Sequence, residues 1–131
     1  MNGAIIGLGH GERVISRAFR FEKIKLLGVY SKNIKKAQKY SKENNLQKNY
    51  KSIDDLINDK EIHLIAIAVP AYYQIGIIKK CLSQNKHIFA EKPITTNLIH
   101  LKKIIPQIRK TNKKFIIDYI YQKHEAFKKF K

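Results

Sequence analysis

The chain has little negative charge. Ten Asp and Glu residues stand against 27 Lys and Arg in 131 residues, giving a formal net charge of +17. Such an excess is one feature of proteins that bind nucleic acid or a membrane surface. However, 23 of the 27 basic residues are lysines, scattered in short pairs, whereas arginine is the preferred bidentate reader. With 22 Ile and 9 Asn, the composition fits an A- and T-rich genome and does not favour a nucleic-acid partner.

Cysteine is scarce and long apolar runs are missing. Cys81 is the only cysteine, which excludes an intramolecular disulfide and favours a reducing, cytoplasmic compartment. Its neighbours predict a buried helix position. The most apolar run, residues 62–69, is far too short to span a bilayer, so no membrane partner is expected.

Motifs for metal or nucleophilic chemistry are also missing. The five histidines stand singly, with no second ligand at metal spacing, and therefore predict no metal site: His10, His63, His87, His100 and His124. Neither a Gly-x-Ser-x-Gly elbow nor a P-loop nor a helical zinc motif occurs.

Apolar runs and helix-period segments alternate along the chain, as in parallel βαβ units. The expected strands include residues 2–6, 24–30, 62–69, 86–90 and 115–121. Six strands with intervening helices predict an α/β fold: a doubly wound parallel sheet in a single domain, residues 1–121. A polar basic tail, residues 122–131, follows.

The helices are expected between these strands. The first follows the glycines and should bury Val14, Ile15, Ala18 and Phe19 on one face. Others are expected after a cap at Ser31 or Asn33, from Ser52 through Ile57, over 72–83 and over 98–108. Pro106 should kink or shorten the last helix. Residues 43–49 are expected to form a polar loop.

A glycine turn follows the first strand. Gly7 permits a tight turn, and Gly9 removes a side chain where a dinucleotide pyrophosphate must approach backbone amides. The third glycine of the usual fingerprint is replaced by Glu12, with Gly11 just before it. A carboxylate there would repel a phosphate. A glycine turn that only joins strand to helix is the alternative interpretation.

The end of the second strand bears on the choice of cofactor. Cofactors without the extra phosphate are usually held there by Asp or Glu, but this chain has Tyr30-Ser31-Lys32-Asn33. Ser31 and Lys32 suit a 2′-phosphate, which favours NADP over NAD. Alternatively, Ser31 is only a helix cap and Lys32 a solvated charge.

Glu91-Lys92-Pro93 follows the expected strand 86–90. A lysine at this strand end, next to a proline that fixes its backbone, is a candidate catalytic residue. Its ammonium would polarise a hydroxyl or carbonyl during hydride transfer, or act as acid or base, and Glu91 would orient it. The alternative is an ordinary surface lysine.

These motifs together resemble the N-terminal half of the glucose-fructose oxidoreductase, inositol dehydrogenase and rhizopine-catabolism (Gfo/Idh/MocA) family. The resemblance spans nearly the whole chain. It is carried by Gly3 to Gly9, Val29 to Lys32, Ile53 to Leu56, Ala66 to Pro70, Asn85 to Pro93 and Tyr119 to Phe127. This chain departs from the family pattern at Glu12, Ala71, Gln74 and Gln122. Members of the family also carry a second domain after the nucleotide-binding domain.

The resemblance implies a Rossmann domain that binds NAD or NADP for an oxidoreductase of sugars, cyclitols or related substrates. It implies catalytic roles for Lys92 and Glu91. The expected cofactor-binding residues are Gly7, Leu8, Gly9, His10, Gly11, Ser31, Lys32, Val69, Pro70 and Glu91. Without a second domain the chain would turn over little substrate alone. It would be either a fragment of a longer enzyme or a subunit completed by a second chain.

A non-catalytic module for nucleotide sensing or protein interaction is the alternative function. It predicts a homodimer through surface that the second domain would otherwise cover. A basic nucleic-acid binder ranks third and predicts affinity that falls steeply with salt.

Overall fold

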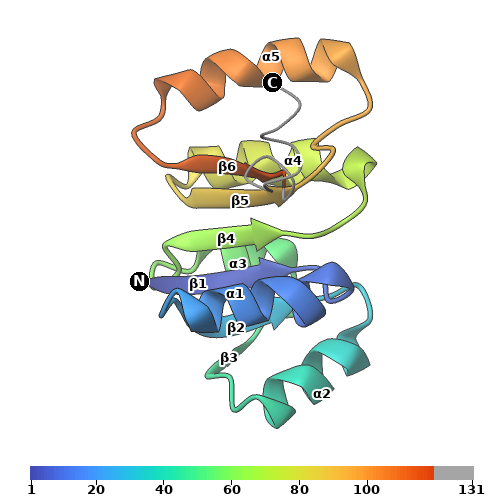
Figure 1. The fold of residues 1–131 in the computed structure, drawn as a ribbon, viewed down its shortest axis with the longest axis vertical. Helices are drawn as coiled ribbons and strands as arrows, with labels where there is room; N and C mark the ends of the chain where they lie inside the picture. The colour runs from blue at the N-terminus through green and yellow to red at the C-terminus, as the bar shows by residue number, and fades with distance from the viewer. Residues whose placement is uncertain (120–131) are drawn as a thin grey trace, which may run out of the picture.

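The computed structural model describes residues 1–119 and contains one sheet of parallel strands (Figure 1). The strand order is β3-β2-β1-β4-β5-β6. The strands are β1 (Asn2–Ile6), β2 (Lys25–Tyr30), β3 (Lys48–Asn49), β4 (Leu64–Ile67), β5 (His87–Glu91) and β6 (Phe115–Asp118). The order reverses between β1 and β4, which is the arrangement of a doubly wound fold. The predicted fold class is therefore confirmed.

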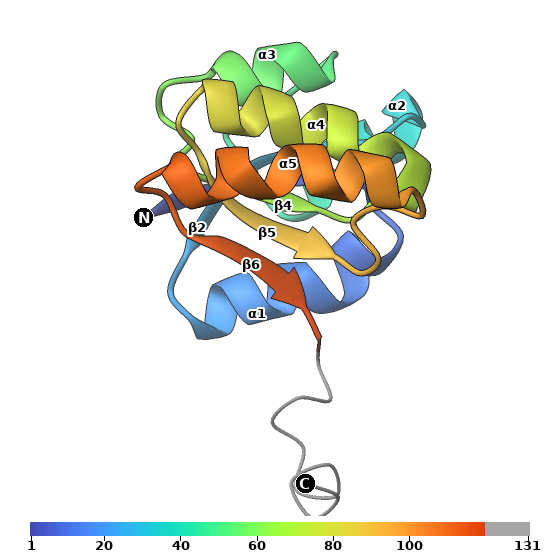
Figure 2. The same cartoon turned by 90° about the horizontal axis from the view of Figure 1, so that it is seen from above.

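Helices cover both faces of the sheet. They are a π-helical turn, η1 (Gly11–Ile15), followed by α1 (Ser16–Phe21), α2 (Ile34–Glu43), α3 (Ile53–Asn58), α4 (Ala71–Ser83) and α5 (Leu98–Lys110). Figure 2 shows α3, α4 and α5 on one face and α1 on the other. α2 packs on the α1 face, because Ala37 and Tyr40 share a buried cluster with Phe19.

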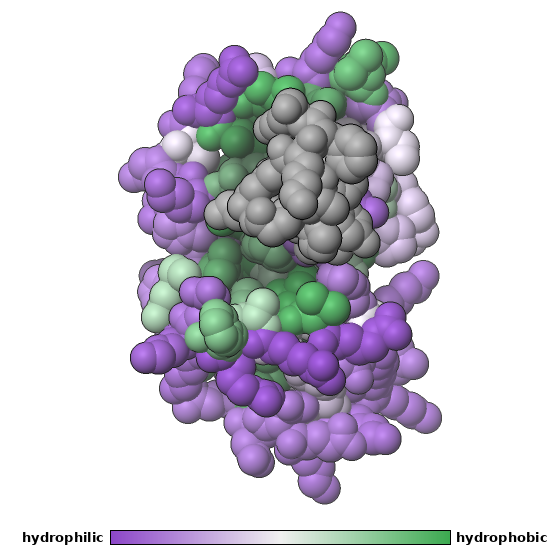
Figure 3. Space-filling model, viewed as in Figure 1, coloured by the Kyte–Doolittle hydropathy of each residue, from purple (hydrophilic) through white to green (hydrophobic). Residues whose placement is uncertain are grey.

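The strands divide the core into two layers because successive side chains point to opposite faces. On β1, Ala4 and Ile6 face the cluster under α3, α4 and α5, while Ile5 faces the cluster under α1 and α2. Cys81 is fully buried on α4, as predicted, and burial raises the pKa of its thiol to about 12. Exposed lysines of α2 contribute to the hydrophilic end of the molecule (Figure 3).

Three local predictions differ from the structure. Val14 and Ala18 are exposed, whereas Ser16 is buried with Ile15 and Phe19, because the wider π turn shifts the inward face. Residues 48–49 of the expected loop form β3. α5 runs through Pro106 to Lys110, so the proline does not shorten it.

Other predictions hold or fall outside the described part. Ser52 and Asn33 cap α3 and α2, their side chains accepting from backbone N–H groups at 3.0 Å. Within residues 1–119, no helix has the length and apolar character needed to cross a bilayer. The tail predicted at 122–131, and the end of the predicted strand 115–121, lie outside the described residues.

Candidate functional site

The turn after β1 depends on Gly7. Its φ is +101°, and a Cβ there would lie 2.3 Å from the Ala68 carbonyl oxygen, so no other residue fits without strain. The Gly7 N–H donates to the Tyr30 carbonyl at 2.9 Å, which ties the turn to β2. A Cβ at Gly9 would meet nothing within 4 Å. Gly9 therefore borders open space, as close approach of a ligand to the backbone requires.

Gly11 takes the place of the missing third glycine. A Cβ there would lie 2.6 Å from Ile5 Cγ2, so the helix can pack on β1 only with glycine at this position. This is the packing role of the third glycine in dinucleotide folds. The π turn η1 begins at Gly11, one residue earlier than the fingerprint places that glycine. The glycine fingerprint is therefore complete in its packing role, with its third glycine shifted by one residue to position 11.

The carboxylate of Glu12 is neutralised within the protein. Lys36 Nζ lies 2.6 Å from Glu12 Oε2 and also donates to the Leu8 carbonyl at 2.7 Å. Both side chains are partly exposed. The repulsion of phosphate expected from Glu12 is therefore offset by a cation from α2, which also fixes the glycine turn.

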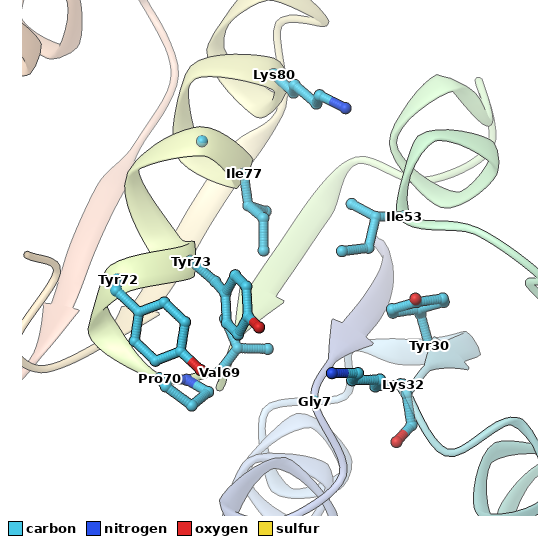
Figure 4. A pocket seen from close by; sticks show the side chains of 12 residues that line it. Gly7, Tyr30, Lys32, Ile53, Val69, Pro70, Tyr72, Tyr73, Ile77 and Lys80 are labelled. Carbon is cyan, nitrogen blue, oxygen red and sulfur yellow. The ribbon is translucent and has the colours of Figure 1, made fainter.

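A cavity of about 610 Å³ opens beside this turn, at the carboxyl ends of β1, β2 and β4. In Figure 4, Tyr30, Lys32 and Ile53 lie on one side, and Tyr72, Tyr73 and Ile77 lie on the other. The lining also includes Gly7, Ser31, Val69, Pro70, Gly76 and Lys80. Five predicted cofactor-binding residues, Gly7, Ser31, Lys32, Val69 and Pro70, thus meet at one cavity.

The charge around the cavity is positive. Among the described residues no Asp or Glu lines it, and the Lys80 ammonium is paired with Asp54 at 2.6 Å. Lys32 makes no ion pair within residues 1–119. Ser31 is not the cap of α2, since Asn33 has that role, and its Oγ accepts from the Asn33 N–H at 3.2 Å. Lys32 is therefore available to an anionic ligand.

Gln74 joins two strand ends. Its side chain is buried, and its Nε2 donates to the Val69 carbonyl at 3.0 Å and to the Pro93 carbonyl at 3.4 Å. The Lys92-Pro93 peptide bond is cis. The glutamine that departs from the family pattern thus fixes the segment that carries Lys92.

Within residues 1–119, the Glu91 carboxylate forms no ion pair with the Lys92 ammonium. Its Oε1 lies 2.6 Å from His10 Nε2, and Asp118 Oδ2 lies 3.9 Å from the same nitrogen. Burial and the neighbouring Asp118 carboxyl raise the pKa of Glu91. Lys92 is exposed and has no ion pair within the described residues. The structure thus places His10 beside Glu91, away from the lining of the main cavity.

Several site residues were missed by the sequence analysis. Tyr72, Tyr73 and Ile53 line the cavity from two helix starts, and Lys36 comes from the middle of α2. Asp118 ends β6. The expected strand 115–121 put Asp118 in mid-strand, so its place at a carboxyl strand end could not be seen from sequence.

The comparison with protein families agrees with this geometry. Residues 1–119 match the family model described as "Oxidoreductase family, NAD-binding Rossmann fold". The chain belongs to the Gfo/Idh/MocA oxidoreductase family. It is 29% identical over 93 residues to an uncharacterized oxidoreductase of Synechocystis sp., covering 70% of this chain and 25% of that protein. It is 25% identical over 113 residues to inositol 2-dehydrogenase of Salmonella typhimurium, covering 86% and 33%.

A solved structure gives the same result. A candidate NADPH-dependent oxidoreductase from Desulfitobacterium hafniense superposes with a TM-score of 0.79 at 31% identity, covering 89% of this chain and 34% of that one. The chain thus spans 25 to 33% of the length of the curated relatives cited above. Membership assigns a nicotinamide dinucleotide-binding Rossmann domain of an oxidoreductase.

Proposed function

We propose that this chain binds NADP(H), in preference to NAD(H), as the cofactor domain of an oxidoreductase that acts on a sugar, cyclitol or related hydroxyl or carbonyl compound. The observation that carries the proposal is the cavity beside Gly7, because it gathers the glycine turn, the end of β2 and the start of α4. Its volume of about 610 Å³ lies within the usual range for cofactor sites.

The preference for NADP rests on charge. A ribose 2′-phosphate at the end of β2 would meet Ser31 and Lys32, and no carboxylate from residues 1–119 lines the cavity to repel it. A charge-assisted hydrogen bond from Lys32 would stabilise the phosphorylated cofactor alone. Tyr72 and Tyr73, with ring centroids 4.0 Å apart, offer aromatic surface on the opposite wall.

The bound nicotinamide would supply the hydride chemistry, and this chain would contribute binding and orientation. Lys92, positioned by Gln74 through the Pro93 carbonyl, would hold or release the proton of the reacting hydroxyl. The relatives extend well beyond the matched region, so we infer that a further domain or a second chain encloses the substrate. Without such a wall, water would reach the reacting atoms and turnover would be low.

Calorimetric titration with NADPH and NADH tests the proposal. We expect micromolar binding of NADPH and weaker binding of NADH. Lys32→Ala should weaken NADPH binding roughly tenfold, about 1.4 kcal/mol, and leave NADH nearly unchanged. Equal affinities for the two nucleotides would contradict the NADP preference, and no binding of either would contradict the cofactor role.

Lys35→Ala provides the matched control. Lys35 is an exposed lysine near the start of α2 and does not line the cavity. Its loss lowers the net charge by the same amount as Lys32→Ala. NADPH affinity should therefore stay within about twofold of wild type in low salt, and a loss as large as that of Lys32→Ala would indicate a non-specific charge effect.

A non-catalytic interaction module is the second candidate, favoured by the surface of β6. Ile116 is 54% exposed and Tyr119 is 53% exposed. β6 is also an edge strand of the described sheet, with a free pairing side. This function predicts a homodimer in sedimentation equilibrium that Ile116→Lys converts to monomer. If the wild-type chain sediments as a monomer both at high concentration and after 100-fold dilution, the result would argue against this function.

A further inference from the structure

A group of three side chains at the carboxyl edge lies outside the lining of the main cavity. His10 follows the glycine turn, Glu91 ends β5, and Asp118 ends β6. Each offers one ligand atom, and these atoms all lie within 4.8 Å of one another. Side-chain exposures are 39% for His10, 16% for Glu91 and 13% for Asp118, so the group is sheltered but reachable.

The strand pairing forces the two carboxylates together. Glu91 and Asp118 are direct partners in the parallel register of β5 and β6. Like charges directly opposite on neighbouring strands destabilise a sheet. Both are shielded from water here, which increases the repulsion. The fold thus brings together two carboxyl groups whose mutual repulsion a cation between them would relieve.

The imidazole of His10 does not satisfy this need through an ordinary hydrogen bond. His10 Nε2 and Glu91 Oε1 are 2.6 Å apart, yet both atoms are buried and neither has a hydrogen-bond partner of acceptable geometry within residues 1–119. Two buried polar atoms this close, with no hydrogen bond to satisfy either, leave both able to act as ligands. With the Asp118 carboxylate, they form a set of three ligand atoms close enough together to share one ion.

We propose that His10, Glu91 and Asp118 bind a divalent transition-metal ion, with Zn²⁺ or Mn²⁺ as the expected class. One imidazole nitrogen and two carboxylate oxygens are ligands that such ions accept, whereas Mg²⁺ and Ca²⁺ favour oxygen alone. Three protein ligands leave coordination positions open to water or to a hydroxyl compound. Because Lys92 follows Glu91, the ion would lie on the side of the crevice where the reacting group is proposed to bind.

The sequence analysis expected no metal site because it sought ligands close together in the chain. These three ligands lie 81 and 27 residues apart in sequence and meet only through the strand order β1-β4-β5-β6. The glycine turn also contributes, since it places His10 beyond β4 and against β5. The proposal rests on this side-chain geometry and is independent of the proposed cofactor preference.

Titration with ZnCl₂ of the chain freed of metal by a chelator, without nucleotide, tests the site. A chromophoric chelator in competition reports the free ion. We expect one equivalent bound with micromolar or tighter affinity. Asp118→Asn and His10→Gln should each weaken binding at least tenfold. His100→Gln and Asp54→Asn, which alter exposed groups on α5 and α3, should leave the affinity within about twofold.

Thermal unfolding separates loss of the site from loss of the fold. Without metal, Asp118→Asn removes a like-charge contact and should unfold no lower than wild type. Added Zn²⁺ should raise the Tm of wild type and not that of the variant. The proposal is overturned if wild type binds no stoichiometric Zn²⁺. It is equally overturned if Asp118→Asn and His10→Gln bind the ion as tightly as wild type.

Discussion

Two glycines that line the same cavity are under opposite constraints. Gly7 has a positive φ and lies against the Ala68 carbonyl, whereas Gly76 lies within α4 with nothing within 4 Å of an added Cβ. The physical role of Gly7 follows from its place after an apolar strand, and it could be predicted from sequence. The freedom at Gly76 depends on how α4 packs, which the sequence does not reveal.

Alanine at these two glycines should therefore change stability in opposite directions. Gly7→Ala is expected to lower the free energy of unfolding by at least about 2 kcal/mol, through the strained φ and the overlap with Ala68. Gly76→Ala should raise it by about 0.5–1 kcal/mol, because alanine loses less backbone freedom in a helix. Urea unfolding measures both, and a loss at both positions would contradict this account of Gly76.

Asp59 forms a polar cluster remote from the site. Its carboxylate accepts from Lys48 Nζ at 2.6 Å, from the Tyr50 hydroxyl at 2.7 Å and from the Glu61 N–H at 2.9 Å. Burial alone would raise the pKa of Asp59, but these hydrogen bonds outweigh it, and the pKa is lowered. The resulting stability is complete above the unfolded pKa of about 4 and is lost as pH falls through the folded value.

Asp59→Asn should thus cost about 1–2 kcal/mol at pH 7 and reduce the acid sensitivity of unfolding below pH 4. The measurement is the urea midpoint across pH 2.5 to 7. Asp54→Asn is the control, because its ion pair with Lys80 is exposed on both sides and should contribute under about 0.5 kcal/mol. Equal pH profiles for wild type and Asp59→Asn would contradict the assignment.

At the scale of elements, the connection between the glycine turn and α2 changes the interpretation of Glu12. From sequence, Glu12 was expected to repel phosphate. Its pairing with Lys36 could not be foreseen, because Lys36 lies 24 residues further on and the direction of its side chain is not evident from sequence. The ion pair between them depends on α2 packing on the α1 face. The helical period also predicted wrongly that Val14 and Ala18 are buried, because a π turn has no distinct sequence period that would have indicated the shift.

The account predicts a specific coupling between Glu12 and Lys36. Lys36→Ala would leave the Glu12 carboxylate uncompensated near the phosphate position and should weaken NADPH binding about two- to fivefold. Glu12→Gln in the same background should restore the affinity. Calorimetry of the double-mutant cycle gives the coupling free energy. Lys39→Ala, which breaks only the exposed pair with Glu43, should have no effect.

α5 accommodates a proline that propensity alone would have placed at its end. Pro106 is exposed and lacks the N–H that would donate to the carbonyl four residues before it. The helix continues because Ile104 is fully buried, with Leu101 and Ile108 packed against the same core. Pro106→Ala should therefore raise the urea midpoint, with a gain of about 1–3 kcal/mol. An unchanged or lower midpoint would show that the helix is adapted to the proline.

At the scale of the whole molecule, most of the architecture followed from the order of apolar segments. Buried runs alternating with helical periods allow few topologies, and the right-handed crossover rule then fixes the placement of the helices. β3 escaped prediction because a two-residue polar strand at a sheet edge has no apolar signature. The proximity of His10, Glu91 and Asp118 was not predicted for a different reason, because it depends on the order and register of the strands.

The central claim is that a dinucleotide binds at the carboxyl edge beside Gly7, and amide chemical shifts of the ¹⁵N-labelled chain during an NADPH titration test it most directly. We expect the largest saturable shifts at Gly7, Gly9, Lys32, Val69 and Tyr73. The opposite edge of the sheet offers an internal control, because His63, His87, Lys86 and Lys113 line a separate basic cavity of about 300 Å³ there. Shifts confined to those residues would indicate non-specific anion binding and contradict the account.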